Sequence, residues 1–325
     1  IGGTDVEITA TIPGGAGLQL SDETLEDGGS IIDVISVNQG LEWLSGPTSF
    51  SSAVAGGYVD SPEDAISAAF NEIFETPASA IKYTGSTNAG FLTDEFKIVP
   101  ADGTTGLPTF SYGPGLMLSS GGFPGTENLS PGATENHGEP GDSDLTATAE
   151  AVFPDANGTF DASAIEFDVN ITDPDVDTLR ASLVFGSEEF PEFVDDFVDI
   201  AAVYVNGVNY AEFEATGKPL SVISENLESG VFIDNNDQQD APYGIEWDGF
   251  SEEIVVRAPV TQGVNTVKIG VADTGDSVLD SGLFVSDLSL QGGGGSGGGV
   301  LKAVTPDETG AVPATIAAEE ITLND

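Results

Sequence analysis

The chain has no cysteine, and it has one histidine and one methionine in 325 residues. The absence of cysteine excludes disulfide bonds, thiolate metal ligands and cysteine nucleophiles. A zinc site needs several histidine or cysteine ligands, so it is excluded as well. His137 is the one residue that could serve as the base of a serine triad. It lies in a polar segment, and no strand–turn–helix carries a Gly-x-Ser-x-Gly nucleophile motif, so we interpret His137 as a polar loop residue.

Basic residues are also scarce, with 7 Lys+Arg against 55 Asp+Glu and a formal net charge of −48. Too few cations are present to neutralise phosphates, which excludes nucleic acid as a partner and disfavours an anionic membrane surface. No apolar run is long enough for a transmembrane helix, so we expect no membrane insertion. The chain begins at Ile1 without a visible signal peptide, and we expect a mature secreted chain whose leader was removed.

Apolar residues are plentiful, because the chain is 39% hydrophobic and has 18 Phe, which argues against disorder. After Thr146, short apolar runs alternate with turn residues, and Asn206-Gly207 is a strong hairpin signal. This pattern predicts a mainly all-β fold, an antiparallel β-sandwich or jelly roll. The predicted strands are 164–169, 181–185, 199–205, 221–224, 253–258, 266–272 and 282–290.

One helix is predicted before this β-rich part, at Pro62–Glu75. Ser61 is a suitable N-cap, Pro62 suits the first helical position, and Ile66 and Phe70 begin an apolar face with helical spacing. The remaining predictions for this half are strands at 5–13 and 30–37, and long Gly/Pro-rich loops over 100–143 with a short strand near 116–119.

We predict a single domain at 1–290, a glycine-rich spacer at 291–299 and a strand-like tail at 300–325. The tail docks either on its own domain or on a neighbouring subunit, and the sequence does not favour one over the other. Strand addition by the tail, or by the N-terminal strand, would join subunits through backbone hydrogen bonds. Such a head-to-tail contact gives an open filament when the rotation does not close. The chain itself is therefore the first expected partner.

Six carboxylates lie within twelve residues between Glu188 and Asp199. Such density is repulsive unless it is neutralised, and calcium, which takes six to eight oxygen ligands, relieves it. A second acidic turn, Asp273 to Asp280, follows an apolar strand, and Gly275 permits a tight turn. We predict that these segments, together with the one at Asp142, converge on Ca²⁺ at one end of the sandwich. The candidate ligands are Asp142, Asp144, Glu188, Glu189, Asp195, Asp196, Asp199, Asp273, Asp276 and Asp280.

Ordinary structural roles compete with this calcium hypothesis. The acids can simply be solvated, or they can form Asx-turns in which Asp caps its own backbone. The loop that starts at Asp173 begins like an EF-hand, but Thr178 replaces the central glycine and Val184 the final glutamate. The oxygen-rich segment Asp234–Asp240 also lacks a central glycine, so only an irregular calcium site is open to it.

Several of these segments carry a family resemblance. Their order, their spacing and above all the Phe-Gly-Ser-Glu-Glu piece resemble the choice-of-anchor L family of secreted and surface bacterial proteins, over roughly residues 60–290. The resemblance implies a β-rich, surface-located protein with no established catalysis. The chain shows no LPXTG-like motif, terminal apolar helix or basic tail, which departs from the family's sorting signals. The matching pieces are 115–121, 141–145, 164–168, 183–193, 245–250 and 272–281.

These features predict a secreted, non-enzymatic, calcium-stabilised structural protein for adhesion, matrix building or a filament. The alternative is a carbohydrate-binding or adhesin module that does not polymerise, with polysaccharide as its partner. Only Trp43 and Trp247 are available as tryptophan platforms for such a site. Glycan cleavage needs only two carboxylates and has no positive support in the sequence. The acidity is also open to interpretation as a salt-adapted surface without a site.

Overall fold

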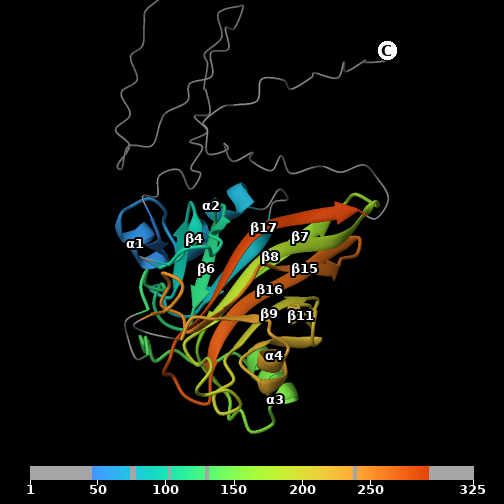
Figure 1. Ribbon diagram of the computed structural model, residues 1–325. Helices are drawn as coiled ribbons and strands as arrows, with labels where there is room; N and C mark the ends of the chain where they lie inside the picture. Colours follow the sequence, from blue (N-terminus) through green and yellow to red (C-terminus); the bar gives the residue numbers. More distant parts are fainter. Residues whose placement is uncertain (1–45, 74–77, 102–103, 129–131, 237–239, 293–325) are drawn as a thin grey trace, which may run out of the picture. The chain divides into compact units, whose positions relative to one another are not determined.

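Two antiparallel sheets face each other in the computed structural model, which describes residues 46–73, 78–101, 104–128, 132–236 and 240–292 (Figure 1). The predictions for 5–13, 30–37, most of the spacer and the whole tail lie outside these residues. Strands dominate the described part and helices are few and short, so the predicted mainly-β sandwich is confirmed.

The first sheet has eight strands. In order they are β1 (Thr48–Ser49), β3 (Gly90–Thr93), β6 (Gly115–Ser119), β17 (Ser281–Gly292), β8 (Val176–Ser187), β14 (Gly249–Ser251) and β13 (Phe232–Asp234), with β15 (Ile254–Pro259) also paired to β8. The second has seven: β11 (Glu212–Phe213), β12 (Lys218–Ser221), β9 (Ile200–Val205), β16 (Gly263–Thr274), β7 (Thr159–Ile171) and β2 (Ala78–Thr84), with β10 (Val208–Asn209) on β9. A small ladder joins β4 (Phe96–Ile98) to β5 (Phe110–Tyr112).

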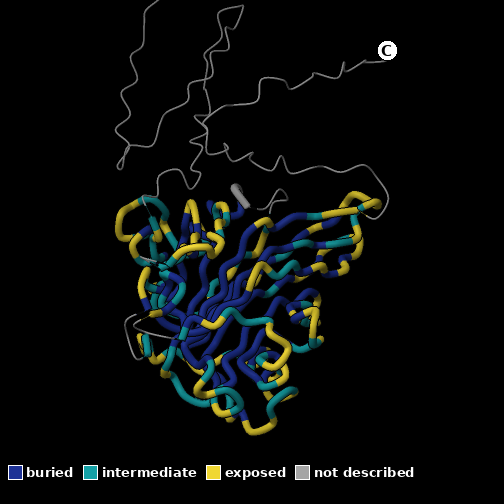
Figure 2. Tube along the Cα trace, in the orientation of Figure 1, coloured by how far each residue is buried: buried dark blue, intermediate teal, exposed yellow. Residues whose placement is uncertain are grey.

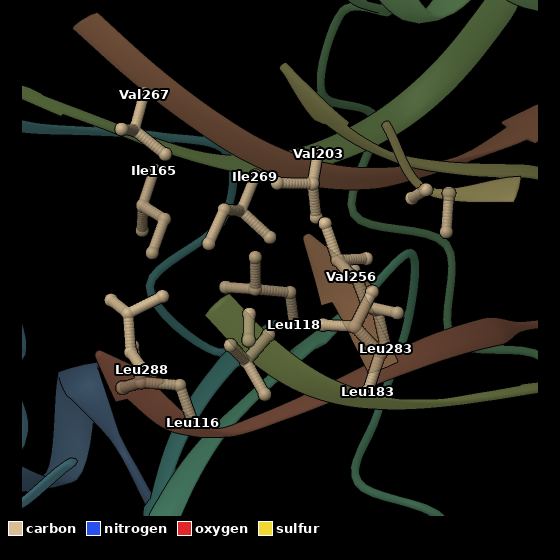
Figure 3. Packing of buried hydrophobic residues seen from close by; sticks show 14 of the residues in the cluster. Leu116, Leu118, Ile165, Leu183, Val203, Val256, Val267, Ile269, Leu283 and Leu288 are labelled. Atoms are coloured by element: carbon tan, nitrogen blue, oxygen red, sulfur yellow. The ribbon is translucent and has the colours of Figure 1, made fainter. Parts of the chain in front are cut away.

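The core lies between the two sheets. Along β16, Val267, Ile269 and Val271 are buried in this core, as the period-2 pattern of a strand requires. They belong to one core cluster with side chains of the opposite sheet such as Leu183 and Leu283, and Figure 3 shows Val267 and Ile269 on one side of this core and Leu183 and Leu283 on the other. Each such side chain stabilises the fold by about 1.5–3 kcal/mol when fully buried.

Both sheets are also covered on their outer faces, and Figure 2 shows that the middle of the sandwich is buried. An aromatic cluster around Phe96, Trp247 and Phe284 packs on the first sheet. The helix α3 (Ser143–Val152) packs Leu145 and Ala149 on the second sheet. Central strands are therefore buried on both faces, which explains why several of them are continuous apolar runs rather than alternating ones.

The predicted helix at 62–75 is confirmed as α2 (Pro62–Ile73), and the predicted hairpin is confirmed by left-handed φ angles of 52° at Asn206 and 81° at Gly207. Three further helices, α1 (Phe50–Ala55), α3 and α4 (Ser224–Glu228), were not predicted. The predicted strand 221–224 is wrong beyond its first residue, because β12 ends at Ser221 and α4 begins at Ser224. Within the described ranges, none of the helices has the length and apolar character needed to cross a bilayer.

Candidate functional site

Two acidic residues far apart in the sequence lie side by side because their strands pair. Ser187, at the end of β8, lies opposite Ser281, at the start of β17. The residue after one strand and the residue before the other are therefore neighbours, and the Glu188 amide donates to the Asp280 carbonyl at 3.2 Å. Both side chains are buried, with 2% and 8% exposed.

A third acid, Asp199, ties the two sheets together at the same end. It precedes β9, which pairs with β16 so that Ile200 lies opposite Ala272. The Asp199 carboxylate accepts a hydrogen bond from the Thr274 amide of β16 at 2.9 Å and one from the Ser281 hydroxyl of β17 at 2.7 Å. One carboxylate thus holds a strand end from each sheet.

A β-bulge lies beside these strand ends. Two residues of β7, Asp161 and Ala162, oppose the single residue Ala272 of β16, and Asp161 has a left-handed φ of 43°. The buried Asp161 carboxylate accepts hydrogen bonds from the amides of His137 and Glu139 at 3.2 and 2.5 Å. Sequence reasoning missed this residue, whose one signal is an acid inside a largely apolar strand.

The acids at this end lack sufficient partners. Glu189 and Asp273 are each 1% exposed. One Glu189 oxygen (Oε2), both Asp273 carboxylate oxygens and the Thr274 hydroxyl make no hydrogen bond. Ser120 lies close enough to favour ionised Asp273, but its hydroxyl hydrogen-bonds to the Ser281 backbone. We call the group of Glu189, Asp199, Asp273 and Thr274 the strand-end cluster.

No cation compensates the strand-end cluster within the described residues. In the described part of the chain, ion pairs are made by Lys97, Arg180, Lys218 and Lys268, and all of their partners are acids outside the strand-end cluster. Burial and the neighbouring carboxylates raise the pKa of Glu189 to about 9. The same two causes raise the pKa values of Asp199 and Asp273 well above the usual range for aspartate.

Glu188 and Asp280 face a separate pocket of about 360 Å³ beside the strand-end cluster. Glu135 and Glu246 add two more carboxylates, and Phe123, Pro124 and Trp247 supply the larger apolar side chains of the wall. Asp280 accepts hydrogen bonds from the amides of Gly122 and Glu135, and Glu188 accepts one from the Ala133 amide at 3.2 Å. The second Glu188 oxygen, Oε1, has no hydrogen bond. Burial and nearby carboxylates raise the pKa of Glu188 to about 9.

The structure gives Asp142 and Asp144 a different environment from the predicted one. Asp142 caps the N-terminus of α3 by accepting from the amides of Asp144 and Leu145. Lys268 Nζ contacts Asp142 at 2.5 Å and Asp144 at 2.8 Å. These two acids share one lysine and lie beside α3, so they are not part of the acidic group described above.

Three other predicted ligands also have roles of their own. Asp195 accepts hydrogen bonds from both the amide and the hydroxyl of Ser224, at the start of α4. Asp196 is exposed. Asp276 forms an Asx-turn by accepting from the Val278 amide at 3.0 Å, yet its charge still raises the pKa of Glu189. Of these three acids, only Asp276 lies near the strand-end cluster.

The remaining polar segments follow the ordinary structural interpretation. Asp173 forms an Asx-turn with the Asp175 amide, and Asp234 forms one with the Asn236 amide. Residues 237–239 of the second loop lie outside the described part. The His137 Nε2 atom lies 3.2 Å from the Gly121 carbonyl oxygen, which gives this side chain a role in holding its loop.

The strand-end cluster offers carboxylate and hydroxyl oxygens that make no hydrogen bond, and such oxygens suit a hard cation. Unpaired buried carboxylates are costly, and Ca²⁺ accepts carboxylate, hydroxyl, carbonyl and water oxygens together. No three Asp, Glu or His side chains in the described ranges form a ready-made metal cage. A cation here would therefore rely on the Thr274 hydroxyl, backbone carbonyls or water as well as on the acids.

Comparison with known proteins gives distant structural similarities. The chain is similar to TmCBM61, a carbohydrate-binding module solved in complex with beta-1,4-galactotriose, with 12% identity, a TM-score of 0.24, and coverage of 66% of this chain and 90% of that one. It is also similar to a family 35 carbohydrate-binding module from an environmental isolate, at 13% identity and a TM-score of 0.20 over 61% of this chain and 98% of that one. The module CBM35 from Cellvibrio japonicus Abf62 gives 10% identity and a TM-score of 0.20 over the same shares. These TM-scores are too low to support a functional argument.

The sequence comparisons are more decisive. No curated protein matches the chain. The family model described as the choice-of-anchor L domain matches residues 79–291. This range contains the strand-end cluster, the pocket and nearly all of both sheets, and β1 lies before it. The match spans well over half of the 325 residues. The chain therefore belongs to the choice-of-anchor L domain family.

Proposed function

We propose that this chain is a non-catalytic, calcium-stabilised β-sandwich module of the cell surface or the extracellular matrix. Membership of the choice-of-anchor family suggests a surface or secreted protein. The main support for calcium is the strand-end cluster, where four oxygen atoms of two buried carboxylates and one hydroxyl make no hydrogen bond. Leaving polar groups buried and unpaired destabilises a fold, and a bound cation removes that cost.

Calcium fits these residues better than magnesium does. Magnesium demands near-octahedral geometry and sheds its water reluctantly, whereas calcium accepts irregular sets of six to eight oxygens. The oxygens without hydrogen bonds come from Glu189, which follows β8 of the first sheet, and from Asp273 and Thr274 at the end of β16 of the second sheet. Each sheet therefore positions part of the site. A cation bound here would join the sheets at this end, as the Asp199 hydrogen bonds already do.

Thermal unfolding with calcium, with magnesium and with EGTA tests this proposal. A ligand that binds only the folded state must raise the melting temperature. We expect calcium to raise it by several degrees above the EGTA value, since about 1–2 kcal/mol of binding shifts a domain of this size by about 2–8 °C. Equal melting temperatures in calcium and EGTA would show that the strand-end cluster holds no calcium.

Two variants make the test specific to the site. Asp273→Asn removes a buried charge and keeps the shape, so it should raise stability in EGTA and abolish the gain from calcium. Asp196→Asn makes the same change on an exposed residue close to the cluster in sequence and should retain that gain. A calcium gain that survives in Asp273→Asn would place the ion elsewhere.

We further propose that the module assembles with itself by strand exchange. The support is sequence-based: the alternating segment 5–13 and the strand-like tail 300–325 are candidates for adding a strand to a neighbouring sheet. Deleting residues 300–325 should shorten or abolish polymers in electron micrographs, and deleting 5–13 tests the other donor. Unchanged polymer length in both deletions, or no polymer from the full chain, would refute strand exchange and favour a non-polymerising adhesin or carbohydrate-binding module.

A further inference from the structure

The pocket beside the strand-end cluster has an unusual combination of charge and shape. Four carboxylates line it, from Glu135, Glu188, Glu246 and Asp280, and no lysine or arginine is among its lining residues. Its volume of about 360 Å³ corresponds to about twelve water molecules at roughly 30 Å³ each. It is therefore far larger than a bare metal ion needs, and it falls within the range of small-molecule pockets.

One side chain points to a missing ligand. Glu188 is 2% exposed, lines the pocket and keeps its Oε1 atom without any hydrogen bond. Its other oxygen is fixed by the Ala133 amide. A buried carboxylate oxygen with no donor calls for one, and a charged donor makes the stronger bond.

Two of the other three acids of the pocket, Glu246 and Asp280, are held in place by the backbone. Glu246 accepts from the Gly125 amide at 2.9 Å, and Asp280 accepts from the Gly122 amide at 3.2 Å. Glycine permits these close approaches, because a Cβ atom would lie 1.9 Å from the Asp280 carboxylate at Gly121 and 2.9 Å from the Glu246 carboxylate at Gly125. The acidic wall is therefore positioned before any ligand arrives, which lowers the ordering cost of binding.

We propose that this pocket binds a small organic cation through its ammonium group. A neutral polyol would satisfy hydrogen bonds but leave the carboxylate charges uncompensated. A bare metal ion would leave most of the volume unfilled, and no three acids in the described ranges form a metal cage. An ammonium group donates three hydrogen bonds and carries the missing charge, while Phe123 and Trp247 offer apolar and aromatic contact to its carbon frame. This inference does not depend on calcium at the strand-end cluster.

Calorimetric titration with matched probes tests the charge requirement. Glucosamine and butylammonium carry the ammonium group, whereas glucose and N-acetylglucosamine are neutral counterparts of the first. We expect both ammonium probes to bind, and the neutral sugars to bind at least about tenfold more weakly, as the loss of a charge-assisted hydrogen bond implies. Glucose binding as tightly as glucosamine would show a polyol site, and no binding by either ammonium probe would refute the proposal.

Variants separate a built pocket from general attraction to an acidic protein. Glu188→Gln and Glu246→Gln should each weaken ammonium binding by about tenfold. Glu127→Gln removes the same charge from an exposed residue that is close to the pocket segment in sequence but does not line the pocket, and it should change affinity less than about twofold. Equal losses in all three variants would mean non-specific attraction. The ammonium titrations are repeated in EGTA, in calcium and with the Asp273→Asn variant. Loss of ammonium binding concerns this pocket, whereas loss of the calcium effect on the melting temperature concerns the strand-end cluster.

Discussion

Individual aspartates show how differently the fold treats the same side chain. Asp142 is half-buried beside Lys268, accepts hydrogen bonds from two backbone amides and caps a helix. Asp273 is buried without a hydrogen bond or a cation. Both come from acidic segments that look alike in the sequence. Their contrast gives Asp142 a structural role and is the reason that the calcium proposal rests on Asp273.

Replacing Lys268 by methionine tests the structural role of Asp142. Lys268→Met keeps the aliphatic stem but leaves a half-buried carboxylate unpaired beside α3, so we expect the free energy of unfolding to fall by about 2 kcal/mol. Urea titration measures this loss. Lys97→Met removes a comparably short but exposed ion pair to Glu95 and should cost less than about 0.5 kcal/mol. Equal losses in the two variants would contradict a special role for Lys268.

The partner of Asp142 could not be predicted from local sequence. Lys268 lies 126 residues away, and the contact exists because α3 packs on the face of β16 that carries this lysine. In the sequence, Asp142 is an acid that follows a Gly/Pro-rich loop, and nothing local distinguishes it from the other acidic segments. Only the tertiary packing decides which acid receives one of the 7 basic residues.

At the scale of elements, long periodic segments were predictable and short ones were not. The helix α2 has a cap, a first-turn proline and one apolar face, so local signals agree. α3 has a weaker apolar stripe, and its cap follows a Gly/Pro-rich stretch that looked like continuous loop. β2 was missed because its register is interrupted between Ser79 and Lys82, where alternation breaks.

The convergence of acids at strand ends was only partly predictable. Glu188, Asp199, Asp273 and Asp280 each flank a predicted apolar strand, so their position at strand ends followed from the pattern. The pairing of β8 with β17 and of β16 with β9 decides which strand ends lie side by side. These pairings depend on the strand order of the whole sandwich. The bulge at Asp161 has a single local signal, an acid within a largely apolar strand, and its position depends on the register of β7 against β16.

For the whole molecule, the charge of −48 divides into two populations. In the described part, the buried acids are Asp161, Glu188, Glu189, Asp199, Asp248, Asp273 and Asp280. The other described acids are half-buried or exposed, which fits a solvated or salt-adapted surface. Burial raises the pKa values of Glu188, Glu189, Asp199, Asp248, Asp273 and Asp280, so the formal charge overstates the charge of the folded protein wherever these groups hold their protons.

The buried acids predict that the protein becomes less stable as the pH rises when calcium is absent. In the folded protein, the pKa values of Glu188 and Glu189 are about 9, against about 4.3 for glutamate in an unfolded chain. Between these values the folded state binds more protons than the unfolded state, so stability is full below the unfolded pKa and is lost as the pH rises through the folded pKa. In EGTA, the free energy of unfolding should therefore fall between about pH 5 and about pH 9, by at most about 1.4 kcal/mol per pH unit for each group.

Calcium should reverse this trend, because the ion binds the ionised carboxylates and competes with their protons more effectively as the pH rises. Urea unfolding across this pH range, in EGTA and in calcium, measures both slopes. Glu189→Gln removes one titrating group and should flatten the EGTA slope, whereas Asp196→Asn should leave it unchanged. A free energy of unfolding that rises with pH in EGTA would mean that these carboxylates are ionised in the folded protein without any cation, and that the strand-end cluster is stabilised by other means.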